Sequence, residues 1–73
     1  MRDIKYFPLN IYNAREEMKM TRAKLAEKID TSERIIYDYE NGIKFPSFAT
    51  LTKLAVALNK TLDYFVTKNR KED

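Results

Sequence analysis

Apolar residues recur at helical spacing in five stretches of the chain, and short polar breaks separate these stretches. The five groups are Ile11, Ala14 and Met18; Leu25, Ala26 and Ile29; Ile36 and Tyr39; Phe48, Leu51, Leu54, Ala55 and Leu58; and Leu62, Phe65 and Val66. Spacings of three and four residues place each group on one face of a helix. The pattern therefore predicts an all-α fold of five short helices.

A polar residue suited to cap a helix stands before each group. These residues are Asn10, Thr21, Ser32, Ser47 and Thr61. Gly42 and Asn59 can adopt the left-handed backbone conformation that ends a helix. Between Thr21 and Gly42, two predicted helices are joined by only a few polar residues. Such a pair is typical of a helix-turn-helix.

The boundaries of the domain follow from the ends of this pattern. We expect one helix-turn-helix domain over residues 10–67, an N-terminal arm over residues 1–9 and a charged, disordered tail over residues 68–73. A chain of 73 residues can bury one core of marginal stability. For Tyr6 and Phe7 in the arm, two alternatives stay open: packing on the domain, or fraying with the terminus.

Composition excludes several classes of function. The chain has no Cys and no His, which removes disulfides, thiolate metal sites and the commonest acid-base group. There is also no glycine-rich phosphate loop, so we expect no enzyme, no metal and no cofactor. No small-molecule effector site is evident.

The sequence also gives limited information about cellular location and about the charge of the binding partner. No apolar run approaches the roughly 18 residues of a transmembrane helix, and no basic-then-apolar leader opens the chain. We therefore expect a cytoplasmic protein that does not bind membranes. A net charge of +3 and a pI near 9.2 give a mild preference for polyanions.

Several short motifs follow one another in fixed order between Ile11 and Phe65. They are Ile11-x-x-Ala14-Arg15-Glu16-Glu17, Met20-Thr21-x-x-x-Leu25-Ala26, the stretch from Ser32 ending Tyr39-Glu40-Asn41-Gly42, Pro46-Ser47-Phe48-x-Thr50-Leu51-x-x-Leu54-Ala55-x-Ala57-Leu58, and Thr61-Leu62-Asp63. In this order and spacing they resemble the phage-repressor (Cro/Xre-type) helix-turn-helix family. The resemblance implies five short helices, of which the second and third bind double-stranded DNA.

The resemblance also implies which side chains contact DNA. It places Glu33, Arg34, Tyr37 and Asp38 as base readers, and Thr21, Arg22, Ser32 and Lys44 as phosphate contacts. A major groove about 12 Å wide admits one helix, and an arginine can bond guanine through two hydrogen bonds. We expect this contact from Arg34. For each of these residues the alternative is an ordinary solvated surface position.

The predicted reading helix is unexpectedly acidic. Its segment Ser32 to Gly42 holds one base, Arg34, and three acids: Glu33, Asp38 and Glu40. The resemblance accounts for one acid, because it implies a structural ion pair between Arg15 and Glu40. The other two either select bases at some loss of affinity, or this surface does not read DNA in the usual way.

Two further expectations come from the resemblance. Family members commonly pair through the last helix, which places Tyr64 and Val66 at a homodimer interface and the two reading helices about 34 Å apart. The family also commonly has glycine where this chain has Lys19, Asp30 and Asn59. These three positions should therefore adopt left-handed turns.

Together these features predict a sequence-specific, double-stranded-DNA-binding transcriptional regulator. The simplest version is a repressor that acts as a homodimer on a two-fold operator. The alternative is a protein-interaction or antitoxin-like module that has the same fold but does not read DNA by its third helix. A salt titration of duplex binding distinguishes the two, because neutralised phosphates make binding steeply salt-dependent.

Overall fold

Four α-helices and two 3-10 helices form the part of the chain that the computed structural model describes, residues 4–69. In chain order they are η1 (Ile4–Tyr6), α1 (Phe7–Glu17), α2 (Arg22–Lys28), α3 (Glu33–Glu40), α4 (Phe48–Leu58) and η2 (Asp63–Val66). No strand occurs within these residues. The predicted all-helical class is confirmed, whereas the helix count differs, since the expected fifth helix is the short η2.

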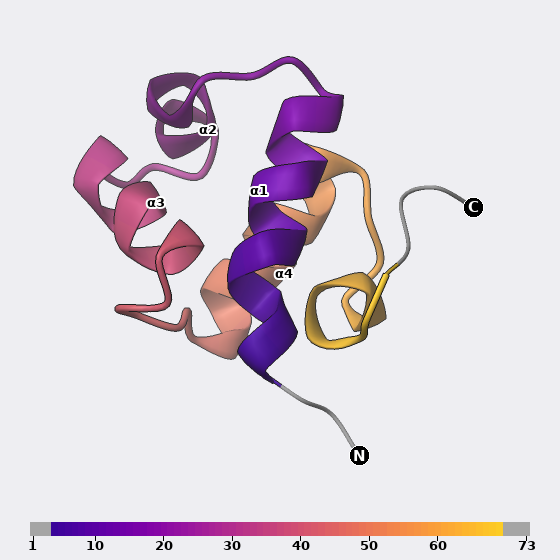
Figure 1. The fold of residues 1–73 in the computed structure, drawn as a ribbon. Coiled ribbons are helices and arrows are strands. Elements are labelled where there is room, and N and C mark those ends of the chain that lie inside the picture. The colour runs from indigo at the N-terminus through magenta and orange to yellow at the C-terminus, as the bar shows by residue number, and fades with distance from the viewer. Residues whose placement is uncertain (1–3, 70–73) are drawn as a thin grey trace.

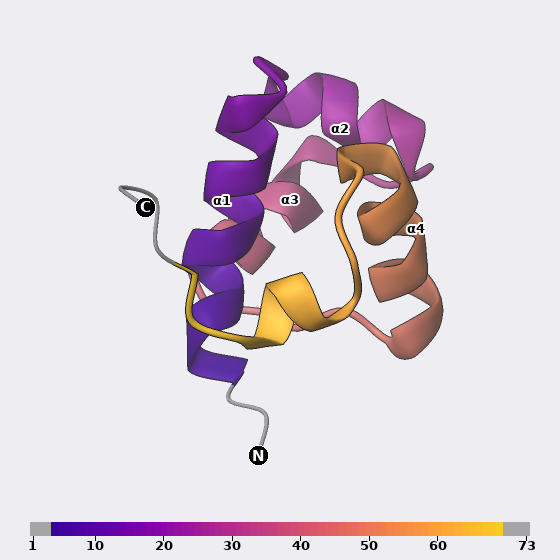
Figure 2. The same ribbon diagram turned by 90° about the vertical axis from the view of Figure 1, so that its right-hand side faces the viewer.

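The helices pack around α1, which crosses the middle of the molecule (Figure 1). α2 and α3 lie on one side of α1 and η2 lies on the other; the view turned by 90° shows η2 in front and α3 behind (Figure 2). The largest fully buried side chains come from all four α-helices and η2: Phe7, Phe65, Ile11, Leu25, Ile36, Leu54 and Leu58. The core thus holds α3 with its outer face exposed.

Hydroxyl side chains fix the starts of α2, α3 and α4, as predicted. Thr21, Ser32 and Ser47 are the N-caps, and their oxygens accept hydrogen bonds from the amides of Lys24, Ile35 and Thr50 at 3.0, 3.2 and 3.2 Å. Each bond satisfies an amide that has no carbonyl partner within its helix. The turn between α2 and α3 is therefore set by local chemistry.

In the segment predicted as an N-terminal arm, Phe7 packs on the domain, which was one of the two alternatives, and does not fray with the terminus. Residues 4–9 are helical, and α1 begins at Phe7 with Pro8 in its first turn, where proline is well tolerated. Phe7 is 1% exposed, and its ring centroid lies 5.8, 5.0 and 6.2 Å from those of Tyr39, Phe45 and Phe65. Residues 1–3 lie outside the described residues.

Asn10 is buried within α1 and is not its N-cap. Its Nδ2 donates to the carbonyl oxygens of Tyr64 and Thr67, at 2.9 and 2.8 Å. Asn69 Nδ2 donates to the same Tyr64 oxygen at 2.7 Å. The Asn10 amide thus holds the C-terminal segment against α1, and Asn69 bonds within that segment, so the predicted tail does not begin at Lys68. Residues 70–73 lie outside the described residues.

The sequence pattern also placed Phe48 on the buried face of its helix, and this prediction is wrong. As the first residue of α4 it is 71% exposed, whereas Leu51, Leu54 and Leu58 are buried as predicted. At this end of the molecule, the ring that contacts the core is Phe45 from the preceding loop. Helical spacing defined the face of α4 but did not show where the core ends.

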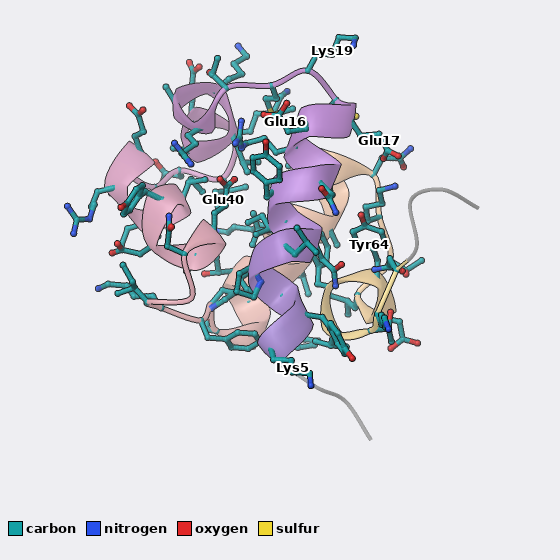
Figure 3. All side chains as sticks on the ribbon, viewed as in Figure 1. Lys5, Glu16, Glu17, Lys19, Glu40 and Tyr64 are labelled. Carbon is teal, nitrogen blue, oxygen red and sulfur yellow. The ribbon has the colours of Figure 1, made fainter. Side chains whose placement is uncertain are left out.

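The three positions at which the family commonly has glycine adopt left-handed backbone, as predicted. Lys19, Asp30 and Asn59 have φ values of 53°, 60° and 57°. Asn and Asp tolerate this region better than other residues with a side chain. Lys19, in the turn after α1 (Figure 3), is therefore the most strained of the three.

Lys19→Gly should stabilise the domain. Removing the side chain relieves a left-handed strain of roughly 1–2 kcal/mol, and the greater freedom of glycine in the unfolded chain offsets about 0.5–1 kcal/mol of that gain. The expected rise in melting temperature, followed by circular dichroism, is a few degrees, at about 4–8 °C per kcal/mol. Asn59→Gly is the matched control and should gain less. A lower melting temperature for Lys19→Gly would contradict this reasoning.

Candidate nucleic-acid interface

The outer face of α3 is polar, while its inner face is part of the core. Ile36 and Tyr39 are buried, whereas Glu33, Arg34 and Tyr37 are exposed. α3 lies at the edge of the molecule, on the side of α1 opposite η2 (Figure 1). This helix therefore presents a free, partly charged face.

A shallow hollow of about 370 Å³ connects this face to the start of α2. It is lined by Arg22, Glu33, Arg34 and Tyr37. The guanidinium carbons of Arg22 and Arg34 both lie 5.4 Å from the centroid of the Tyr37 ring, within the range of a cation–π interaction. Two arginines from different helices thus share one aromatic side chain.

Asp38 does not belong to the exposed face, contrary to the sequence-based prediction. The residue is 4% exposed, and its Oδ1 accepts a hydrogen bond of 3.0 Å from Arg34 Nε, one helical turn earlier. The chain also folds back over its backbone, because the amides of Ile43 and Lys44 donate to the Asp38 carbonyl at 2.9 and 3.3 Å. A buried, paired carboxylate is poorly placed to contact a base directly.

The ion pair predicted between Arg15 and Glu40 is present in the structure. Arg15 Nε and Nη2 donate to Glu40 Oε2 and Oε1 at 2.6 and 3.1 Å, and Arg15 Nη1 donates to the Met20 carbonyl at 2.7 Å. The Glu40 side chain is only 2% exposed. It lies where α1, α2 and α3 meet (Figure 3).

Arg22 is a third member of this cluster, which the sequence did not indicate. Its Nε donates to Glu40 Oε1 at 3.0 Å, while its side chain remains 36% exposed. Glu40 therefore joins three helices through two arginines. The hydrogen bond to Glu40 raises the pKa of Arg15 above its ordinary value. Arg22 is thus anchored to Glu40 while part of its side chain stays accessible at the surface.

The acidity of the α3 sequence is thus largely internal. Glu40 and Asp38 are buried and bonded to arginines, so Glu33 is the acid that α3 exposes. Arg34 carries the matching positive charge, with its side chain 75% exposed. The charge imbalance counted along the sequence does not describe the surface that a ligand would meet.

The other predicted phosphate contacts lie around α3. Thr21 and Ser32 are exposed N-caps, and each uses its oxygen as an acceptor from an amide, which leaves the hydroxyl proton able to donate. Lys44 is exposed in the loop after α3. Ser32 caps the helix that carries Arg34 and Thr21 caps the helix that carries Arg22, whereas Lys44 lines a separate hollow with Phe7, Pro8 and Phe45.

The predicted dimer residues are less accessible than expected. Val66 is 5% exposed and packs inside the molecule, so it does not form a surface contact. Tyr64 is half-buried: its ring lies 5.3 Å from that of Phe65, and Lys60 Nζ lies 4.6 Å from its centroid. Lys60 in turn forms an ion pair of 2.6 Å with Glu17, which lies near Tyr64 (Figure 3).

Among residues 4–69 no cluster of acidic side chains could hold a metal ion. In the same range no helix has the length and apolar character needed to cross a membrane.

Comparison with known proteins places this arrangement among helix-turn-helix proteins. The helix-turn-helix family matches residues 11–65. Vegetative-specific protein H7 of Dictyostelium discoideum is 46% identical over 55 residues, which cover 75% of this chain and 53% of that protein. Multiprotein-bridging factor 1c of Arabidopsis thaliana is 39% identical over 54 residues, covering 74% and 36%. A helix-turn-helix-type transcriptional regulator of Rickettsia conorii is 36% identical over 55 residues, covering 75% and 44%.

These relatives are all longer than the matched domain, so the chain spans about half of their length or less. Among solved structures, hydroxypropylphosphonic acid epoxidase from S. wedmorenis superposes with a TM-score of 0.82 over 90% of this chain and 35% of that chain, at 21% identity. At that identity the likeness concerns the fold alone.

Proposed function

The chain belongs to the Cro/C1-type helix-turn-helix family, and we propose that it is a transcriptional regulator that reads duplex DNA with α3. The observation that carries this proposal is the paired placement of Arg22 and Arg34 on Tyr37, at the exposed edge of the helix-turn-helix. Two cations at the starts of adjacent helices fit one base edge and one phosphate.

Each exposed residue has a role in the proposal. Arg34 bonds a guanine in the major groove, and Glu33 accepts from a cytosine amino group. Tyr37 contacts a thymine methyl group or a phosphate. Phosphate contacts come from residues around α3, namely Thr21, Arg22, Ser32 and Lys44. The proposal requires a cell compartment that contains DNA. The cytoplasmic location expected from the sequence remains a prediction.

The first test is selection of bound duplexes from a random pool, followed by titration of the selected duplex by fluorescence anisotropy. Affinity should fall linearly on a log–log plot against salt, with a slope of about 0.9 per neutralised phosphate. Binding that does not depend on salt would contradict the proposal, as would a pool without enrichment at low salt.

Arg34→Lys and Arg22→Ala should affect this binding differently. Lysine keeps the charge but loses the planar fork, so discrimination at one base pair should fall by about 1–3 kcal/mol. Arg22→Ala should weaken all duplexes alike and lower the salt slope by about one phosphate. Both variants are first shown to be folded by circular dichroism. Identical effects of the two substitutions would contradict the division between base reading and phosphate contact.

We further propose that the regulator is a homodimeric repressor that blocks its operator. One domain of this size buries too little surface for tight, specific binding. Ile43, Phe45 and Phe48 are exposed apolar side chains within eight residues after the end of α3, and we assign the pairing surface to them. Pairing through these residues would place the α3 helices of the two copies close to the dimer contact. Pairing through η2, which lies on the side of α1 opposite α3, would place the two α3 helices far from the contact.

Phe48→Glu should therefore weaken self-association without unfolding the domain, since Phe48 is outside the core. Sedimentation at tens of micromolar protein, with and without the selected duplex, measures the fraction of dimer. Val56→Glu is the matched control, because Val56 is another exposed apolar residue of α4. Equal effects of the two substitutions, or monomers throughout, would contradict this surface.

A second candidate function is binding to another protein. Some relatives are named multiprotein-bridging factors, and a groove of about 530 Å³ outside the α3 face is lined by Lys28, Thr52, Lys53, Val56 and Ala57. This function is favoured if no duplex is enriched at low salt.

A further inference from the structure

We propose that Asp38 is a positioning residue for base recognition, which acts by holding the guanidinium of Arg34 in place. This inference rests on the proposed function, since it concerns how α3 would read a base. It also replaces the prediction that Asp38 reads a base itself. Asp38 acts from inside the protein, and Arg34 makes the contact.

The hydrogen bond between these two residues has the geometry that this role needs. Arg34 Nε donates to Asp38 Oδ1 at 3.0 Å, and this bond uses one of the five N–H donors of the guanidinium. The Asp38 side chain is 5% exposed, whereas that of Arg34 is 75% exposed. The carboxylate is thus fixed in the protein, and the arginine extends from it towards solvent.

The Tyr37 ring restrains the same guanidinium from another side. Arg34 Cζ lies 5.4 Å from its centroid. A planar group held at its Nε by a carboxylate and against an aromatic ring has few orientations left. Long arginine side chains lose substantial rotamer entropy on binding, and groups that are already ordered bind with more affinity and selectivity.

Arg22 shows the same arrangement on the neighbouring helix. Its Nε donates to the buried Glu40, and its Cζ lies 5.4 Å from the same Tyr37 centroid. Each arginine of the hollow is therefore bonded through Nε to a buried acid and lies over one shared ring. The repeated arrangement explains why a reading helix with one base carries two buried acids: both acids bind arginines.

The charge of Asp38 makes the inference testable. An acid that only repelled phosphates would, on neutralisation, leave base preference unchanged and strengthen binding to every duplex. An acid that read a base would act at its own base pair. A positioning acid should act at the base pair read by Arg34.

The experiment measures relative affinities of the folded protein for the selected duplex and for its single-base-pair variants. Asp38→Asn should reduce discrimination at the base pair that is sensitive to Arg34→Lys by about tenfold or more, and leave the other positions unchanged; one good bidentate contact corresponds to roughly 5- to 150-fold. When Asp38→Asn is combined with Arg34→Lys, it should reduce discrimination no further, because the guanidinium that Asp38 orients is absent. Glu27→Gln removes the same charge at an exposed position of α2 outside the proposed contacts. It is the matched control and should not act at that base pair.

Three results would overturn the inference while leaving the proposed function intact: unchanged discrimination in Asp38→Asn, an effect at a different base pair, or additivity with Arg34→Lys. A wild-type protein that enriches no duplex would instead refute the proposed function, and this inference with it.

A second measurement needs no DNA. The Nε–H resonance of Arg34, assigned by its absence in Arg34→Lys, should show slow solvent exchange in the wild type and faster exchange in Asp38→Asn. Equal exchange in the two proteins would show that Asp38 does not hold Arg34 in solution.

Discussion

Glu40→Ala should destabilise the domain by roughly 3–5 kcal/mol, which is the usual loss when one partner of a buried ion pair is removed. Arg15, which is 6% exposed, would then keep only the exposed carboxylate of Glu16, 3.5 Å from its Nη1, to compensate its charge. Arg22 would lose its partner too, although it is partly solvated. In a domain of this size the loss corresponds to a fall in melting temperature of about 12–40 °C.

Thermal unfolding followed by circular dichroism measures this effect in a graded series. Arg15→Ala should approach the effect of Glu40→Ala. Arg22→Ala should lower stability less, because Arg15 still neutralises Glu40 and exposed pairs contribute only about 0–1 kcal/mol. Glu27→Ala is the control, since Glu27 forms only an exposed pair with Lys24. An unchanged melting temperature in Arg15→Ala would mean that the pair does not support the fold.

Phe7→Ala should have a comparable effect, about 3–5 kcal/mol for a buried phenylalanine. The side chain contacts three other aromatic rings, and its removal leaves a cavity between α1, the loop after α3, and η2. The change tests whether the first turn of α1 is part of the core rather than an arm.

Urea unfolding compares this variant with Phe48→Ala, the same chemical change at an exposed position. Phe48→Ala should remain within about 0.5 kcal/mol of the wild type, as surface substitutions usually do. If the two variants unfolded at the same urea concentration, the first turn of α1 would not be packed in solution.

Local features of the sequence predicted the elements of the helix-turn-helix well. Thr21 and Ser32 correctly predicted the starts of α2 and α3, because a hydroxyl cap accepts a hydrogen bond from an amide only three residues away. Asn59 was correctly placed in the left-handed conformation that ends α4. Both partners of each such interaction lie within a few residues of each other, so a short stretch of sequence contains them both.

Long-range partners were beyond this kind of reasoning. The resemblance to a family, and not the residue pattern, indicated that Arg15 bonds Glu40. Nothing in the sequence indicated that Arg22 joins them, since its partner is 18 residues away. Asp38 was assigned to the outer face because helical spacing gives the direction of a side chain and not what covers it.

By itself the sequence determined an all-helical domain and the positions of α2, α3 and α4. The tertiary structure decided which side chains are exposed: it buries Phe7, Asp38 and Val66, and it exposes Phe48. The physical reason is that caps and periodicity are short-range properties, whereas burial and ion pairing depend on which distant segments pack together. The surface that we propose reads DNA, with its buried acids and outward arginines, exists only in the folded chain.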